Sequence, residues 1–237
     1  MLLKDNWKPY SLSWERFLGI LFVYYILFRL IFPQFAYSLQ LSENLTSNGN
    51  IEVKYQVLVY LATLLPCIFL IFPLLKKEIK INFKRLFISI FIVIFVGLLL
   101  NIIFNLIVTW INGDYVTSEN QSGLDELAIQ SKWLFLSMSL LLAPILEEIV
   151  FRGTIFHFIR ERKGFLIAAI ISSVLFGFIH VFSSLLNGNI IDFIYLFLYS
   201  ALGFIFCVVY ESNRSIYACI VVHMLYNAYA SMDLILS

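Results

Sequence analysis

The chain has 237 residues, of which 61% are hydrophobic and only 13% are charged, and its mean hydropathy is +0.91. An ordinary soluble domain is about a quarter charged, so this composition excludes a soluble globular protein and indicates a polytopic membrane protein. The net charge of +1 comes without a basic stripe, so we expect the lipid bilayer as surroundings and no nucleic-acid partner.

Seven apolar stretches approach the about 20 residues that a helix needs to cross a hydrocarbon core of about 30 Å. They are continuous and do not alternate, which favours an all-α transmembrane bundle over a barrel, because helices satisfy their own backbone hydrogen bonds in lipid. We expect one integral membrane domain over 1–237, with three helices and an outer loop in 1–132 and a core in 133–237. The predicted spans are 14–32, 55–75, 86–111, 133–158, 165–182, 190–210 and 215–236.

Basic residues predict how these spans are oriented. Lysines and arginines cluster in 76–85 and 160–163, and the bias of positive charge toward the cytoplasm places both connections inside. Alternation of the spans then places the N-terminus in the cytoplasm and the C-terminus outside, in a multi-pass cell-membrane protein. Segments 34–54 and 112–132 fall outside, and we read the second as a connector or short surface helix.

Small and polar residues four apart predict a helix contact on the third span. Gly97, Asn101 and Asn105 fall on one face, where glycine permits close approach and amides can hydrogen-bond across helices. We therefore expect this face to pack against another span. The three cysteines of the chain fall in apolar runs without metal or disulfide spacing, so we expect them to be small core residues.

The fourth span contains LEEIVFR (146–152), with three ionisable side chains in six residues. A charge at mid-depth costs about 2.5–3.5 kcal/mol, so such a cluster needs partners or a wet cavity. Glu148 and Arg152 are four residues apart, in the order that favours pairing on one helix face. Glu147 lies about 100° around the helix and is left without a partner there, which makes it the candidate reactive group. Arg29 is expected near the end of the first span.

Other polar residues reach the depth of Glu147. Counted at about 1.5 Å per residue from the basic connections, Glu147 and His180 rise about 20–24 Å, and His223 and Asn227 rise about 13–20 Å. The i, i+4 spacing turns His223 and Asn227 toward one side. Pro144 lacks an amide hydrogen and could open the helix to water. Four polar groups on three helices are therefore expected to share one wet pocket.

This set of side chains predicts hydrolysis of an amide by activated water. A carboxylate in a low-dielectric pocket is a usable general base, so Glu147 and His180 would activate the water. His223 and Asn227 would donate hydrogen bonds to the oxyanion. No serine has a nucleophile elbow and no cysteine lies in an electropositive site, so covalent catalysis is disfavoured.

Two other interpretations stay open at this point. Glu147, His180 and His223 match the three protein ligands of a catalytic zinc site, although HExxH is absent and each ligand comes from a different helix. We expect no cofactor, with zinc as the alternative. The same residues could also form a structural polar network in a non-catalytic protein.

Three motifs resemble those of the CPBP family, which comprises CAAX-prenyl proteases and bacteriocin-processing enzymes and is also called the Abi family. EEIVFR (147–152) resembles EExxxR, FGFIH (176–180) resembles FxxxH, and HMLYN (223–227) resembles HxxxN. Each motif alone is weak, but the three in this order within membrane helices are specific. The resemblance covers about 133–237.

The resemblance implies an intramembrane glutamic endopeptidase of bacterial type. Its catalytic residues would be Glu147 and His180 for the water and His223 and Asn227 for the oxyanion, supported by Glu148, Arg152 and Phe176. The substrate would be a small peptide or a membrane-protein segment, in peptide or bacteriocin maturation or immunity. The alternative is a non-catalytic regulator or immunity protein that binds a sensor kinase or a bacteriocin-system partner.

Overall fold

The computed structural model describes residues 11–43, 51–114, 117–189 and 192–236, and the secondary structure within these ranges is entirely helical. Six helices are long and apolar enough to cross a membrane, and a seventh, α11 (Ile216–Ala230), is apolar but shorter. The predicted all-α bundle of about seven spans is therefore confirmed, in a multi-pass membrane protein.

The first long helix is longer than the sequence suggested. It runs over Trp14–Ser42 as α1 (Trp14–Leu21), the π-helix η1 (Phe22–Ile31) and α2 (Phe32–Ser42). The predicted end at residue 32 was wrong, because the helix continues through Pro33, whose missing amide hydrogen is accommodated where the wide turns of η1 join α2. Arg29 consequently lies in the middle of this helix.

The other helices follow the predicted order, with ends moved by six residues or fewer. The second and third spans are α3 (Val53–Lys77) and α4 (Phe83–Asn112), and the outer segment forms the surface helix α5 (Glu119–Gln130). The fourth span, Lys132–Lys163, consists of α6 (Lys132–Ser137), π-helix η2 (Met138–Leu142), α7 (Ala143–Glu148), π-helix η3 (Ile149–Phe156) and α8 (His157–Lys163). The chain ends with α9 (Phe165–Leu186), α10 (Phe193–Asn213), α11 and α12 (Met232–Leu236).

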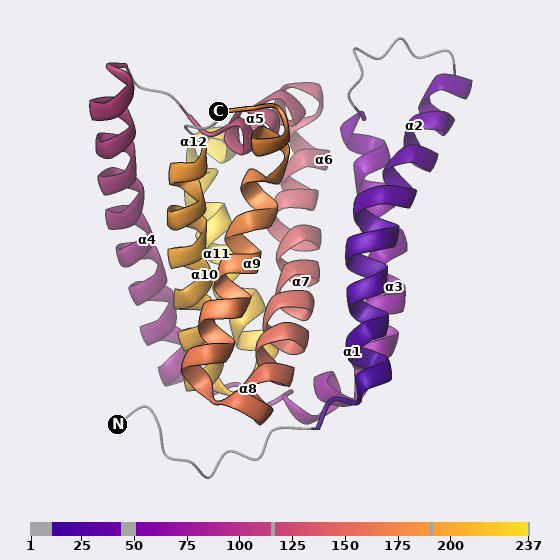
Figure 1. Cartoon of the computed structure of the whole chain (residues 1–237), viewed down its shortest axis with the longest axis vertical. Helices are drawn as coiled ribbons and strands as arrows, with labels where there is room; N and C mark the ends of the chain where they lie inside the picture. The colour runs from indigo at the N-terminus through magenta and orange to yellow at the C-terminus, as the bar shows by residue number, and fades with distance from the viewer. Residues whose placement is uncertain (1–10, 44–50, 115–116, 190–191, 237) are drawn as a thin grey trace.

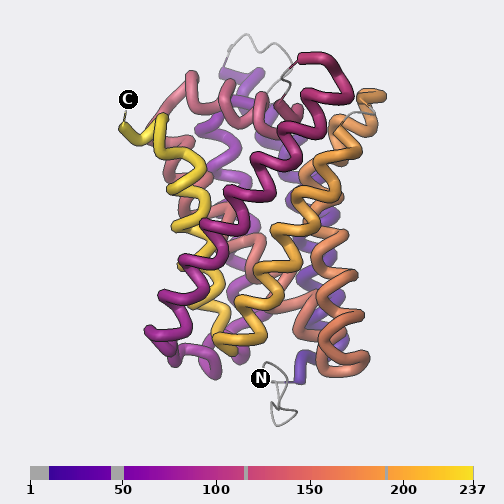
Figure 2. Tube along the Cα trace, turned by 90° about the vertical axis from the view of Figure 1, so that its left-hand side faces the viewer, coloured from indigo at the N-terminus to yellow at the C-terminus, as the bar shows by residue number. Residues whose placement is uncertain are grey.

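The C-terminal helices form the middle of the bundle. In Figure 1, α7, α9, α10 and α11 lie between α1 and α3 on one side and α4 on the other. Figure 2 shows α4 beside α10 and α11, which it contacts. The ring of Tyr226 covers Gly97 so closely that a Cβ there would overlap it, and Asn101 Nδ2 donates to the Tyr226 hydroxyl at 2.9 Å. These two positions confirm the contact predicted for the third span.

Basic residues of separate connections gather at one end of the bundle. Arg160 of α8 forms an ion pair with Glu211 of α10 at 2.8 Å, and Arg85 Nη1, at the start of α4, donates to the Ser212 carbonyl at 2.8 Å. The structure thus confirms that these connections share one side of the membrane. Their assignment to the cytoplasm is still a prediction.

At this same end, Glu78 caps α11 from a distant part of the chain. Its carboxylate accepts hydrogen bonds from the Ile216 amide at 2.9 Å and from the Tyr210 hydroxyl at 2.7 Å, and His157 Nδ1 lies 2.8 Å from that hydroxyl. The Ser215 hydroxyl donates to the Glu78 carbonyl at 2.7 Å. Burial raises the pKa of Glu78 to about 7, opposed by the hydrogen bonds from Tyr210 and Ile216.

We expect Gly177→Ala to disturb the contact between α9 and α10. A Cβ at Gly177 would collide with Ser200 Oγ and lie 2.8 Å from the Leu196 carbonyl oxygen and the Ser200 amide nitrogen, so backbone would have to move. Overpacking of this kind costs about 1–3 kcal/mol and should lower the melting temperature of the purified protein. Gly123→Ala is the control, because its Cβ meets nothing within 4 Å. Equal losses in both variants would contradict the expectation.

We expect Glu78→Gln to flatten the pH dependence of stability. The pKa of Glu78 is raised from its ordinary 4.5, so the folded state favours the protonated acid. Its stabilising contribution is complete below pH 4.5 and is lost as the pH rises through 7, a change on the order of 3 kcal/mol. Melting temperatures measured from about pH 5 to pH 8 should fall more steeply for the wild type than for Glu78→Gln. The exposed Glu15→Gln is the control, and parallel profiles for all three proteins would refute this assignment.

Candidate active site

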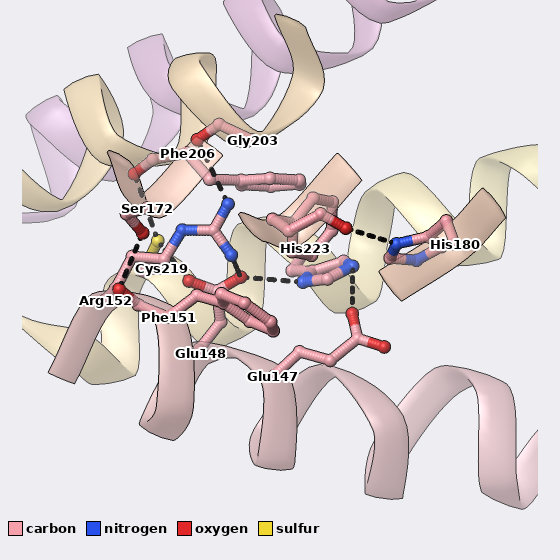
Figure 3. Close-up of polar contacts among 11 residues, drawn as sticks. Glu147, Glu148, Phe151, Arg152, Ser172, His180, Gly203, Phe206, Cys219 and His223 are labelled. Carbon is pink, nitrogen blue, oxygen red and sulfur yellow. Dashed lines mark hydrogen bonds and ion pairs between the residues drawn. The ribbon is translucent and has the colours of Figure 1, made fainter. Parts of the chain in front are cut away.

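A buried ion pair lies at the centre of the candidate site. Arg152 Nη1 donates to Glu148 Oε1 at 2.9 Å, and both side chains are fully buried, which confirms the pairing predicted from their spacing. Arg152 Nη2 donates to the Gly203 carbonyl at 3.0 Å, and the guanidinium carbon lies 4.6 and 5.1 Å from the ring centroids of Phe176 and Phe206. Figure 3 shows how this pair joins the helix Lys132–Lys163, called the motif helix below, to its neighbours.

Two side chains of α11 also form hydrogen bonds with the Glu148 carboxylate. His223 Nδ1 lies 2.8 Å from Glu148 Oε1, and the Cys219 thiol donates to Oε2 at 3.0 Å. A carboxylate paired with an arginine accepts only, so Nδ1 of His223 carries the proton. Its Nε2 then points away from Glu148 (Figure 3). Cys219 is buried as expected, and its contact with Glu148 is an additional finding, because no cysteine spacing signals it.

Glu147 lies at the other edge of the His223 ring. Its Oε2 is 3.8 Å from His223 Nε2, and 14% of its side chain is exposed, whereas Glu148 is fully buried. Adjacent helical residues point about 100° apart, which places one carboxylate in the core and the other beside the histidine. The direct neighbour of Glu147 is thus His223, and no nitrogen of His180 lies within 4 Å of it.

His180 reaches the same region from α9. Its Nδ1 lies 2.7 Å from the Phe176 carbonyl, and its ring stacks on Tyr199 with centroids 4.6 Å apart. A carbonyl can only accept, so Nδ1 carries the proton and Nε2 is available for acid–base chemistry. His180 is half-buried and lies within electrostatic range of Glu147. Phe176 is a packing residue, in contact with Phe151, Arg152, His180 and His223.

Asn227 lies one turn after His223 on α11. Its Nδ2 donates to the Ser139 carbonyl in η2 at 2.9 Å. An amide nitrogen carries two hydrogens, so one is left for another acceptor. The oxyanion role predicted for Asn227 depends on this second hydrogen.

The first two spans also reach the site, which the sequence did not predict. Tyr24 and Arg29 of η1 and Tyr60 of α3 lie within electrostatic range of Glu147. The Tyr24 ring makes an edge contact with Phe151, with centroids 5.7 Å apart. A charged residue in the middle of a membrane span would have indicated that the first span contributes to the site. Arg29 did not give this signal, because the first span was expected to end ten residues too early.

The zinc alternative does not fit this geometry. Glu147 and His223 approach each other, but the described part of the chain has no group of three or more His, Cys, Asp or Glu side chains that could hold a metal ion. We therefore derive no step through a metal. The expected independence from cofactors is still a prediction.

Comparison with known proteins finds one family model and one relative that are similar to the C-terminal part of the chain. Residues 129–229 match the family model "Type II CAAX prenyl endopeptidase Rce1-like". Over 112 residues, the chain is 36% identical to "Putative membrane peptidase YdiL" of Bacillus subtilis (strain 168). This match covers 47% of the chain and spans only 41% of that relative. No solved structure matches the chain. The matched region, residues 129–229, contains all three motifs, so this part of the chain is similar to type II CAAX prenyl endopeptidases and to "Putative membrane peptidase YdiL".

Proposed function

We propose that this protein is an intramembrane endopeptidase that hydrolyses a peptide bond in a small peptide or a membrane-protein segment. One observation carries the proposal: two adjacent glutamates in opposite environments. Glu148 is buried and paired with Arg152, whereas Glu147 is partly exposed and lies 3.8 Å from His223. The family match and the name of the Bacillus subtilis relative support a peptidase.

In this proposal Glu147 is the general base. It removes a proton from a water molecule as the water oxygen attacks the carbonyl carbon of the substrate. His180 helps to orient the water through its unprotonated Nε2, since Nδ1 is held by the Phe176 carbonyl. General-base catalysis of this kind contributes about 10²–10⁴-fold in rate.

His223 and Asn227 then stabilise the tetrahedral intermediate. The proton taken by Glu147 can move to His223 Nε2, 3.8 Å away, and Glu148 compensates the resulting imidazolium through Nδ1. The Nε2–H and the second amide hydrogen of Asn227 stabilise the oxyanion. The same proton passes to the amine nitrogen as the C–N bond breaks, which restores the starting state. Glu148 and Arg152 act as positioning residues, because they fix the imidazole.

We expect Glu147→Gln to abolish processing of the natural substrate. The change keeps the shape of the side chain and removes the base, so turnover should fall about 10²–10⁴-fold. Comparative peptidomics of cells with wild-type protein and with Glu147→Gln would reveal the peptide that is no longer cut. Glu15→Gln, at an exposed position near the start of α1, is the matched control.

The outcome also separates the protease from a non-catalytic regulator. A regulator that binds a partner through its helices would keep its cellular effect in both Glu147→Gln and His180→Ala, at normal abundance and membrane insertion. Unchanged peptide profiles in the Glu147→Gln cells would refute the proposed function.

We expect proteolysis to continue after metal removal. Purified protein treated with a chelator should cut the peptide recovered above at the untreated rate, because water activation is assigned to Glu147 and His180. Metal analysis of the active sample gives the second measurement. Activity that requires stoichiometric zinc would contradict the proposed mechanism.

A further inference from the structure

Arg29 is a cation in the middle of a membrane helix. It lies fifteen residues after the start and thirteen before the end of Trp14–Ser42, about 20 Å from either end at about 1.5 Å per residue. Glu147 has a similar position, fifteen residues after the start and sixteen before the end of Lys132–Lys163. A charge at this depth costs about 2.5–3.5 kcal/mol, so an anionic or polar partner is expected.

The side chains in direct contact with Arg29 among the described residues are all neutral, and Glu147 acts on it only at longer range. Its Nη2 donates to the Tyr24 hydroxyl at 3.1 Å, and its guanidinium carbon lies 5.4 Å from the ring centroids of both Tyr24 and Phe28. The wide turn of a π-helix aligns residues five apart, which brings Tyr24 and Arg29 together. No described carboxylate lies within 4 Å of Arg29. Most of the five N–H donors of the guanidinium are therefore unused.

Arg29 lies in the same region of the bundle as the proposed catalytic residues. Arg29 is exposed, His180 is half-buried, and the Glu147 side chain is 14% exposed, so none of the three is sealed in the protein core. The charge of Arg29 lies within electrostatic range of Glu147 and of His180. The edge contact of Tyr24 with Phe151 fixes η1 against the motif helix.

We propose that Arg29 is a specificity-determining residue that binds a carboxylate of the peptide substrate next to Glu147. This inference rests on the proposed function. The anionic group that an unmodified peptide carries is a carboxylate, at its C-terminus or on Asp or Glu, and its two oxygens match the guanidinium fork. Lipid phosphates lie at the helix ends, about 20 Å away, so the anion has to arrive with the substrate. Tyr24 is the positioning residue that holds the guanidinium.

Binding of peptide probes to purified Glu147→Gln protein in nanodiscs tests this inference, because cleavage is blocked. All four fluorescent probes share one apolar sequence. One pair differs by a C-terminal acid or amide, and the second, with amidated ends, differs by an internal Glu or Gln. We expect the acid member of at least one pair to bind about 10-fold to 100-fold more tightly than its neutral partner, as for a hydrogen bond between charged groups. The responding pair identifies the source of the carboxylate.

Addition of Arg29→Met should remove this preference, so that the acid and the neutral member of each pair bind alike. Arg29→Lys keeps the charge without the fork, so it should retain part of the preference, and it serves as the second variant if the methionine variant does not fold. Arg16→Met, near the start of the same helix, is the matched control and should keep the full preference.

Three results would overturn the inference: no acid preference in the parent protein, no binding of any probe, or an undiminished preference in the folded Arg29 variants. The last would leave Arg29 a structural role with Tyr24, in which case Tyr24→Phe and Arg29→Met would lower the melting temperature alike. Because binding is measured without cleavage, failure of the carboxylate site is distinguishable from failure of the proposed peptidase activity.

Discussion

The buried pair of Glu148 and Arg152 is the interaction on which the candidate site depends. Desolvation of two charges is offset only when geometry is good and the remaining donors and acceptors are satisfied. Here Glu148 also meets Cys219 and His223, while Arg152 contacts a carbonyl and two aromatic rings. Four membrane helices, Lys132–Lys163, α9, α10 and α11, are therefore held together by contacts of a single pair of charges. Removal of either partner would leave the other buried and uncompensated.

Helix geometry explains why Glu147, the residue next to this pair, is more exposed than Glu148. Because successive residues point about 100° apart, Glu147 leaves the core at the position where Glu148 enters it. Its helix segment α7 lies between the π-helices η2 and η3, and Pro144 occupies its first turn. Such wide turns rotate the side chains that follow, and they often occur at functional sites. The local backbone thus combines a rigid carboxylate with an accessible one.

Much of this arrangement could be predicted from the sequence. Continuous hydropathy determines the order of the spans, and i, i+4 spacing determines the pairs within one helix, such as Glu148 with Arg152. Contacts between helices depend on how each helix is rotated, which spacing does not determine. Counting residues along the helices placed Glu147 and His223 at overlapping depths, but their direct approach and the thiol contact of Cys219 could not be derived from spacing. Arg29 was misplaced for a different reason, because a proline within a continuing helix was read as its end.

The presence or absence of an ion-pair partner distinguishes the two arginines of the site, and it distinguishes the two glutamates in the same way. Arg152 is surrounded by a carboxylate, a carbonyl and aromatic rings, whereas Arg29 has a hydroxyl and aromatic rings only. In lipid an arginine stays charged, and Glu147 acts on Arg29 only at a distance, so no described residue supplies an anion in direct contact with it. The buried, ion-paired Arg152 and Glu148 hold the structure together. The partly exposed members, Arg29 and Glu147, are left to meet a substrate, which connects the N-terminal helices to the proposed chemistry.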